Sequence, residues 1–372
     1  MSRQRAAARS RAAPIERVEV AAFTVPTDAP ESDGTLEWDR TTIVTVHVTA
    51  GDMTGLGYSY TDVSAGILIE RMLADVVIGC DAMDVESCYV DMVRAVRNIG
   101  RQGLAATAIA AVDIALWDAK ARLLDLPLVS LLGGTRESVP VYGSGGFTSY
   151  TIGRMQTQLG EWASQGLRAV KMKIGRDPAA DRQRVHAARQ VVGDDVGLFV
   201  DANGAYDRKQ ALSQARAFAA DDGRWFEEPV SSDDLEGLRL IRDRAPAGME
   251  IAAGEYGYDV QYFNRMVRAG AVDVLQADAT RCCGVTGFLR AGAICDAAGL
   301  PLSAHTAPSV HVHPCCAVSR VRHLEYFHDH VRIERKLFDG ALTPVDGELR
   351  PDRSRPGLGI ELKSQDAEPF AV

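Results

Sequence analysis

Two lysines in one apolar segment are the first residues whose type and spacing could do chemistry. Lys171 and Lys173 lie in the segment Leu167–Gly175, which has the pattern of a β-strand. Because side chains alternate along a strand, both ammonium groups point to the same face. Two ammonium groups on an interior face indicate a site that needs positive charge and lowers lysine pKa values. An exposed strand edge with both lysines in water is the alternative.

Three carboxylates follow later strand-like segments at regular intervals. The interval from Asp201 to Glu227 is nearly the same as the interval from Glu227 to Glu255. Both intervals are close to one βα unit of about 30 residues, so the three side chains are expected at neighbouring strand ends. Clustered carboxylates repel one another unless a cation lies between them, and Mg²⁺ prefers oxygen ligands. We therefore assign Asp201, Glu227 and Glu255 as the ligands of one Mg²⁺ per active site.

A second group suited to proton transfer follows two further strands. Asp278 and His305 are predicted to lie side by side, with the carboxylate fixing the imidazole tautomer and raising its basicity. Substrate contacts are predicted for four residues: Ser144, Asn203, Tyr58 and Tyr60. The two tyrosines lie in a glycine-containing segment, Asp52–Tyr60, which is expected to be a loop over the pocket. A second polar loop is expected at Pro26–Asp39, and both loops are predicted to set specificity.

The elements that position these residues form an alternating pattern after Val139. Short apolar segments alternate with amphipathic helical segments, which predicts parallel strands joined by right-handed crossovers. The eight candidate strands are Pro140–Tyr142, Ala169–Ile174, Gly197–Val200, Arg224–Phe226, Glu250–Ala252, Val272–Leu275, Leu300–Leu302 and His323–Glu325. Eight strands favour a closed α/β barrel of the (β/α)7β TIM-like type, because an eighth helix is not evident. Such barrels carry their active sites at the carboxyl ends of the strands.

The first third of the chain has a different pattern. Two alternating segments, Val18–Phe23 and Thr42–Val48, predict antiparallel strands, and Ala65–Leu124 has helical spacing that ends in a helix of small residues. The sequence thus predicts an α+β capping domain at residues 18–136, after a flexible tail at residues 1–17. The barrel domain is placed at residues 137–345, and residues 346–372 are expected to return to the capping domain.

Composition narrows the class of protein. The chain is 46% hydrophobic and 24% charged, which is typical of a folded globular protein. A formal charge of −9 argues against a nucleic-acid surface, and no apolar run approaches the length of about 20 residues that spans a bilayer. The seven cysteines lack metal-type spacing and are interpreted as reduced thiols of a cytoplasmic protein. The small-residue helices suggest a homo-oligomer.

Together these motifs resemble the enolase superfamily, and within it the mandelate racemase type. The matching pieces are Lys171-Met-Lys173, Asp201-Ala-Asn203, Glu227-Glu-Pro229, Gly254-Glu255, Asp278 before Gly284-Val-Thr-Gly287, His305, and His323-Leu-Glu325. The resemblance covers about residues 18–362 and implies Mg²⁺-dependent removal of the proton α to a carboxylate, giving an enediolate. It implies Lys173 as the base, with its pKa lowered toward neutrality by Lys171 and the metal. It also implies that Lys171 and a protonated Glu325 contact the small-molecule carboxylate substrate.

The fate of the carbanion stays open at this stage. Two opposed acid/base groups allow racemisation or epimerisation of a 2-hydroxy acid, or dehydration of an acid sugar (aldonate or aldarate), which the resemblance favours. His305, His311 and His313 suggest a zinc hydrolase instead, although the His-x-His pair follows the seventh strand and not the first. His311, His313, His328 and His330 are better interpreted as surface or packing residues. A barrel that only binds a partner is disfavoured because all the reactive side chains are present.

Overall fold

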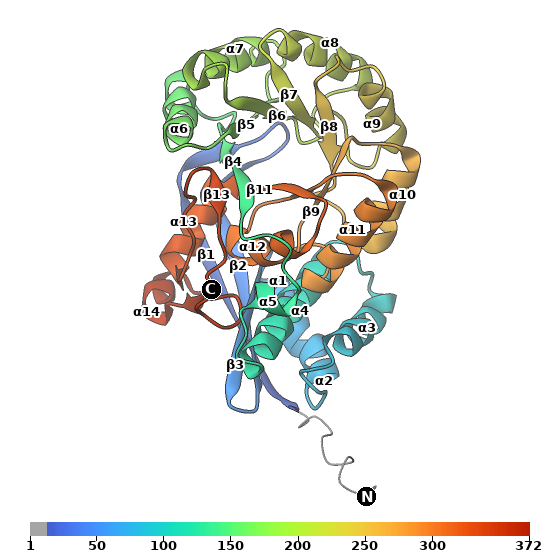
Figure 1. The fold of residues 1–372 in the computed structure, drawn as a ribbon, viewed down its shortest axis with the longest axis vertical. Helices are drawn as coiled ribbons and strands as arrows, with labels where there is room; N and C mark the ends of the chain where they lie inside the picture. The colour runs from blue at the N-terminus through green and yellow to red at the C-terminus, as the bar shows by residue number, and fades with distance from the viewer. Residues whose placement is uncertain (1–12) are drawn as a thin grey trace, which may run out of the picture.

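The computed structural model describes residues 13–372, and Figure 1 shows a barrel above a smaller domain. The predicted flexible tail lies mostly outside the described residues, and Ile15–Arg17 already belong to the first strand. The smaller domain contains an antiparallel sheet in the order β1 (Ile15–Ser32), β2 (Glu37–Ala50), β3 (Met53–Tyr60). Its helices are α1 (Ser64–Leu68), the π-helix η1 (Ile69–Leu73), α2 (Ala74–Val77), α3 (Val85–Ala95), the 3₁₀ helix η2 (Val96–Asn98), α4 (Leu104–Leu123) and α5 (Leu128–Leu131).

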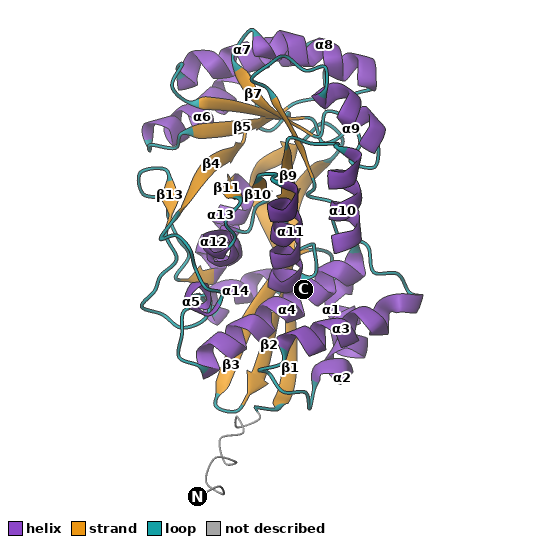
Figure 2. Cartoon of the chain, turned by 45° about the vertical axis from the view of Figure 1, so that its right-hand side comes forward, coloured by secondary structure: helices purple, strands orange, loops and turns teal. Residues whose placement is uncertain are grey.

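The expected loop at Asp52–Tyr60 is wrong, because Met53–Tyr60 forms strand β3. Its two glycines allow α4 to lie directly on the strand (Figure 2). A Cβ added to Gly55 would lie 2.2 Å from the Ala115 carbonyl oxygen, and one added to Gly57 would lie 2.1 Å from that of Ala111. The small-residue helix predicted for this region therefore serves close packing within the chain. The homo-oligomer stays a prediction.

The second expected loop, Pro26–Asp39, is also largely wrong. Strands β1 and β2 continue through it as a two-stranded ribbon, which turns where the Asp33 amide donates to the Leu36 carbonyl at 3.0 Å. The ribbon leaves the three-stranded sheet beyond the Phe23–Ile43 pair, and its register shifts between Pro26 and Glu31. In Figure 1 this blue ribbon rises from the capping sheet to the barrel. Its tip packs closely there, since a Cβ at Gly34 would lie 2.5 Å from the Ala202 carbonyl oxygen.

Eight parallel strands close the predicted barrel, with β11 paired to β4. They are β4 (Val139–Gly145), β5 (Ala169–Lys173), β6 (Gly197–Asp201), β7 (Gly223–Glu227), β8 (Glu250–Ala253), β9 (Val274–Ala277), β10 (Leu302–Ala304) and β11 (Val321–Phe327). Strands β9 and β10 begin two residues later than predicted. The helices that follow them are α6 (Ile152–Ser164), α7 (Asp181–Val192), α8 (Arg208–Ala219), α9 (Leu235–Arg242), α10 (Val260–Ala269), α11 (Gly284–Ala298), α12 (Pro308–Ala317) and α13 (His328–Leu337). An eighth helix, α13, thus follows β11.

The barrel interior separates packing from chemistry by strand alternation. Tyr142, Phe199, Trp225, Ala252 and Val274 form one buried apolar cluster. The next residue on the same face lies two positions later, and there four of the five strands carry a polar side chain: Ser144, Asp201, Glu227 and Gln276. The apolar cluster therefore packs in the barrel interior beneath the ionisable side chains.

The C-terminal segment contains β12 (Phe338–Asp339), β13 (Glu348–Leu349), β14 (Glu361–Leu362), α14 (Ser364–Ala367) and the 3₁₀ helix η3 (Glu368–Phe370). It contacts the capping domain at two places. The Leu358 amide donates to Asp118 of α4 at 2.6 Å, and the Val372 amide donates to the Ala22 carbonyl of β1 at 3.1 Å. Among the described residues, no helix is both long and apolar enough to cross a membrane.

Candidate active site

The three predicted metal ligands come together at the barrel mouth. Asp201 and Glu227 end strands β6 and β7, Glu255 lies two residues past β8, and all three are buried. Each offers an oxygen within 4.8 Å of the other two, and Glu255 Oε2 is buried without a hydrogen-bond partner. Trp225, which sequence reasoning missed, donates from Nε1 to Glu227 Oε2 at 2.9 Å and orients that ligand. This all-oxygen donor set fits Mg²⁺.

Lys171 is fully buried and joins the triad to Glu325. Its Nζ lies 2.6 Å from Glu227 Oε1, 2.9 Å from Glu325 Oε1 and 3.3 Å from Asp201 Oδ2. Burial disfavours the ammonium form, but Glu227 and Glu325 outweigh burial and raise the pKa of Lys171. The exposed-edge alternative for this strand is therefore wrong, and Lys171 is held as a cation.

Lys173 contacts the triad from the next inward position of β5. Its Nζ donates to Asp201 Oδ2 at 2.5 Å, and burial opposes the charged form. The Asp201 carboxylate, with smaller contributions from Glu255 and Glu227, nevertheless raises the pKa of Lys173 above its ordinary value. This is the direction for the protein without a metal ion, and a pKa lowered by Lys171 together with a bound metal stays a prediction.

Glu325 on β11 is the last acidic side chain of the group around Lys171. Its expected protonated form is wrong for the protein without substrate or metal. Burial favours the neutral acid, but Lys171 and then His305 reverse this and lower the pKa of Glu325 to about 2. One carboxylate oxygen accepts the Lys171 contact, whereas Oε2 is buried without a hydrogen-bond partner. An ionised Glu325 with a free oxygen faces the mouth.

His305 and Asp278 form the predicted pair. His305 Nδ1 lies 2.8 Å from Asp278 Oδ2, which leaves Nε2 directed at the triad, 3.3 Å from Glu255 Oε2. Burial opposes ionisation of Asp278, but the hydrogen bond and charge of His305 lower the pKa of Asp278 well below its ordinary value. Arg281 was missed by sequence reasoning, although it lies only three residues after Asp278. Its guanidinium lies 3.2 Å from Glu255 Oε1 and 3.7 Å from Asp278 Oδ2, so it links both groups.

Two of the predicted substrate contacts have free polar atoms at the mouth. Ser144 Oγ and Asn203 Oδ1 are buried without hydrogen-bond partners. Asn203 has φ +47°, and its backbone amide donates to Asp201 Oδ1 at 3.0 Å, which holds the loop after β6 in place. The adjacent Glu228 has a buried Oε1 without a partner and lines a neighbouring cavity.

Tyr58 and Tyr60 occupy other positions than predicted. The Tyr58 hydroxyl donates to Glu334 Oε1 of α13 at 2.6 Å, and the Tyr60 hydroxyl donates to the His330 carbonyl at 3.2 Å. The Tyr60 ring also stacks on the His330 ring, with centroids 3.4 Å apart. Both tyrosines therefore join the capping sheet to α13, and we do not assign them to the substrate.

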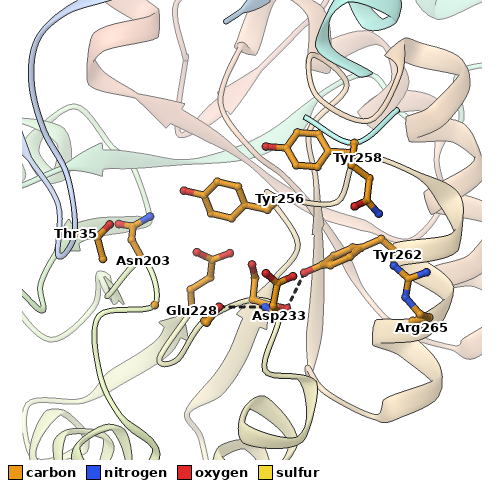
Figure 3. Close-up of a pocket in the computed structure, with 12 residues that line it drawn as sticks. Thr35, Asn203, Glu228, Asp233, Tyr256, Tyr258, Tyr262 and Arg265 are labelled. Carbon is orange, nitrogen blue, oxygen red and sulfur yellow. Dashed lines mark hydrogen bonds between the residues drawn. The ribbon is translucent and has the colours of Figure 1, made fainter. Parts of the chain in front are cut away.

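A cavity of about 550 Å³ opens beside the triad. Figure 3 shows Asn203 beside Thr35 of the ribbon, with the Glu228 carboxylate directed toward Tyr256. The remaining lining residues are also mainly polar: Gln102, Gly204, Ser231, Ser232, Asp233, Tyr258, Tyr262 and Arg265. The cavity thus suits a ligand that carries several hydroxyl groups.

The histidines of α12 do not form a zinc site. His311 Nδ1 lies 2.8 Å from the Thr306 carbonyl oxygen, and His313 Nε2 lies 3.0 Å from that of Leu358. Both rings are buried, and burial lowers the pKa of each. The packing interpretation is confirmed for these two residues, whereas a surface position is wrong.

Comparison with known proteins places the chain in a family. Residues 17–133 match the mandelate racemase/muconate lactonizing enzyme N-terminal domain, and residues 154–367 match the enolase C-terminal domain-like family. A 3,6-anhydro-alpha-L-galactonate cycloisomerase from Streptomyces coelicolor is 32% identical over 94% of this chain and 97% of its own length.

Two solved structures are similar throughout. A mandelate racemase/muconate lactonizing enzyme-like protein from Rubrobacter xylanophilus is 56% identical, with a TM-score of 0.95 over 96% of this chain and 100% of that chain. L-talarate/galactarate dehydratase from Salmonella typhimurium, liganded with Mg and L-lyxarohydroxamate, is 30% identical, with a TM-score of 0.90 over 100% of this chain and 96% of that one. The chain therefore belongs to the mandelate racemase/muconate lactonizing enzyme family of the enolase superfamily.

Proposed function

We propose that the chain is a Mg²⁺-dependent acid-sugar dehydratase that acts on an aldonate or aldarate. One observation carries this proposal: Lys173 Nζ and His305 Nε2 reach the same carboxylate triad from different strands, at 2.5 Å from Asp201 and 3.3 Å from Glu255. A substrate bound between them has one proton-transfer group for its α carbon and another for its β-hydroxyl. Asp201, Glu227 and Glu255 would hold Mg²⁺, which when bound would supply positive charge to stabilise the enediolate.

Each step of this reaction is assigned to particular residues of the chain. Lys171, with Ser144, holds the substrate carboxylate, and Lys173 in its neutral form removes the α proton. The imidazolium of His305, held by Asp278, donates a proton to the β-hydroxyl. The Cβ–O bond then breaks, water leaves, and a carbon–carbon double bond forms. The resulting enol tautomerises to a 2-keto-3-deoxy acid, so one water is lost and no oxidant is needed.

The polar cavity supports an acid sugar over an apolar carboxylate. Thr35, Asn203 and Ser232 present hydroxyl and amide groups along it, and these suit the hydroxyls of a sugar chain. The names of the similar dehydratase and cycloisomerase also refer to acid sugars.

Racemisation or epimerisation of a 2-hydroxy acid is the second candidate function. It is favoured by the Asp278–His305 pair, because a histidine held by a carboxylate can also take up an α proton. In that case His305 and Lys173 exchange the α proton on opposite faces, and no water is lost.

A screen of aldonates and aldarates with Mg²⁺ tests the proposal. We expect a 2-keto-3-deoxy acid from at least one of them, activity lost with EDTA, and activity restored by Mg²⁺. Recovered 2-hydroxy acid that carries deuterium from D₂O and has inverted configuration, without any keto acid, would instead establish the second candidate.

A further inference from the structure

A second group of possible metal ligands lies outside the barrel mouth. Asp28 and Glu31 belong to the β1–β2 ribbon, whereas His328 begins α13, near the other end of the chain. Each offers one donor atom, and the three atoms lie within 4.8 Å of one another. His328 Nε2 is 3.2 Å from Asp28 Oδ2. The fold therefore brings two carboxylates and an imidazole together from two separate elements.

Glu31 supplies the observation that points to a ligand. Its side chain is fully buried, and Oε1 has no hydrogen-bond partner, whereas Oε2 accepts from Trp38 Nε1 at 3.0 Å. An unpaired buried carboxylate oxygen costs free energy, so such an atom normally binds a donor or a cation. No ion pair joins Glu31 to a basic residue in the part of the chain that the structure describes.

The neighbouring Arg332 and Arg154 contact groups other than Glu31. Arg332 Nη2 donates to Asp329 Oδ1 and to the Pro26 carbonyl, both at 2.6 Å, whereas Arg332 Nε is buried without a hydrogen-bond partner. Arg154 lies 3.5 Å from Asp28 Oδ1 and over the Tyr150 ring. Among the described residues, Glu31 Oε1 thus has no hydrogen-bonded cationic partner.

We propose that Asp28, Glu31 and His328 bind a second divalent cation, of the transition-metal class that includes Zn²⁺ and Mn²⁺. One imidazole with two carboxylates matches the mixed nitrogen and oxygen donors that these ions accept, whereas the all-oxygen triad suits Mg²⁺. The Asp28 side chain is 42% exposed, which gives an ion access from solvent. A bound ion joins the ribbon, whose Thr35 lines the cavity, to α13 of the barrel domain.

Equilibrium dialysis of the full chain with metal analysis tests this site. In excess Mg²⁺, we expect one Zn²⁺ per wild-type chain and less than a tenth of that in Glu31→Gln. Asp28→Asn and His328→Asn are expected to weaken Zn²⁺ binding by at least tenfold. Glu37→Gln is the matched control, because Glu37 lies on the same ribbon and pairs with Arg176 at 2.9 Å. It is expected to bind Zn²⁺ like the wild type.

Mn²⁺ allows both sites to be counted in one experiment, because it also binds at Mg²⁺ sites. We expect two Mn²⁺ per wild-type chain, and one each in Glu31→Gln and Asp201→Asn. Zn²⁺ should also raise the melting temperature of the wild type but not of Glu31→Gln. A wild-type chain that binds no Zn²⁺ and a single Mn²⁺ overturns the proposal. That result would mean that a proton occupies Glu31, whose pKa is raised to about 9 by burial, Asp329 and Asp28.

Discussion

A residue of the capping sheet helps to hold Asp278 and His305, the proposed acid/base pair of the barrel. The Ser59 hydroxyl of β3 donates to the Thr280 carbonyl at 2.5 Å, and the amide and hydroxyl of Thr280 both donate to Asp278 Oδ1 at 2.7 Å. The other Asp278 oxygen contacts His305. The orientation of the imidazole therefore depends on a chain of hydrogen bonds that begins in the other domain.

The two proton-transfer groups should be separable by mutation. Lys173→Ala is expected to lower turnover on the true substrate by about 10²–10⁴-fold and to abolish exchange of the α proton in D₂O, because it removes the base. His305→Asn is expected to lose dehydration to a similar extent but to retain that exchange. Turnover with D₂O exchange followed by NMR measures both. The matched controls are Lys209→Ala and His186→Asn, which change exposed residues. Wild-type turnover in both site variants would contradict the assignment.

The sequence could predict the members of the site but not their charge states. Lys171, Asp201 and Glu227 could be located because strand ends of a parallel barrel converge, so intervals along the chain indicate neighbours in space. Protonation depends on distances, and the 2.5 Å contact of Lys173 with Asp201 is not encoded in any spacing. Arg281 was missed for a related reason, since a lone arginine on a loop is usually solvated.

At the scale of elements, the packing of α4 on β3 leaves no room for a side chain at Gly57. An added Cβ would meet backbone atoms of α4, 2.1 Å from the Ala111 oxygen and 2.4 Å from the Ala115 nitrogen. Gly57→Ala is therefore expected to lower the free energy of unfolding by about 1–3 kcal/mol, measured by urea unfolding. The control is Gly153→Ala on exposed α6, where nothing lies within 4 Å, and stability should stay the same or rise by up to about 1 kcal/mol. A Gly57→Ala protein as stable as the wild type would refute this packing argument.

Prediction of strands and helices from the sequence was correct where apolar segments were short and had clear ends. Strand β6, Gly197–Asp201, matches its predicted position because a buried parallel strand is a nearly continuous apolar run. The ribbon was missed because Pro26, Pro30 and several acids interrupt the alternation that marks a strand, although cross-strand partners still pair. Helix α13 was missed because charged residues make up half of its sequence and only three aliphatic residues mark its apolar face.

At the scale of the whole molecule, buried ionisable groups join the two domains. Glu334 of α13 accepts hydrogen bonds from Tyr58 of the capping sheet and from Ser309 of α12, both at 2.6 Å. Asp113 of α4 accepts one from the Thr286 hydroxyl of α11 at 2.6 Å. Sequence patterns could predict two domains but not these contacts, because each partner lies far away in the sequence or on an unpredicted helix.

The buried carboxyls and histidines change the pH dependence of stability in opposite directions. Burial raises the pKa of Asp113 and of Glu334 to about 7, so each contributes stability that is present below its ordinary pKa and lost as pH rises through about 7. Burial lowers the pKa of His313 to about 4 and of His323 to about 3, and it lowers that of His330 well below its ordinary value. Below about pH 6.5 these histidines favour the unfolded chain, because they take up a proton only when the chain is unfolded.

Each of these histidines makes stability rise with pH up to about pH 6.5, whereas each carboxyl makes stability fall by up to about 1.4 kcal/mol per pH unit until pH passes about 7. Urea unfolding from pH 5 to 8 at saturating Mg²⁺ measures both effects, and the ion keeps the triad in one state. Relative to the wild type, Glu334→Gln should remove a fall in stability between about pH 5 and 7, whereas His313→Gln should remove a rise below about pH 6.5. A stability difference between the wild type and Glu334→Gln that stays constant from pH 5 to 8 would show that Glu334 is ionised in the folded protein.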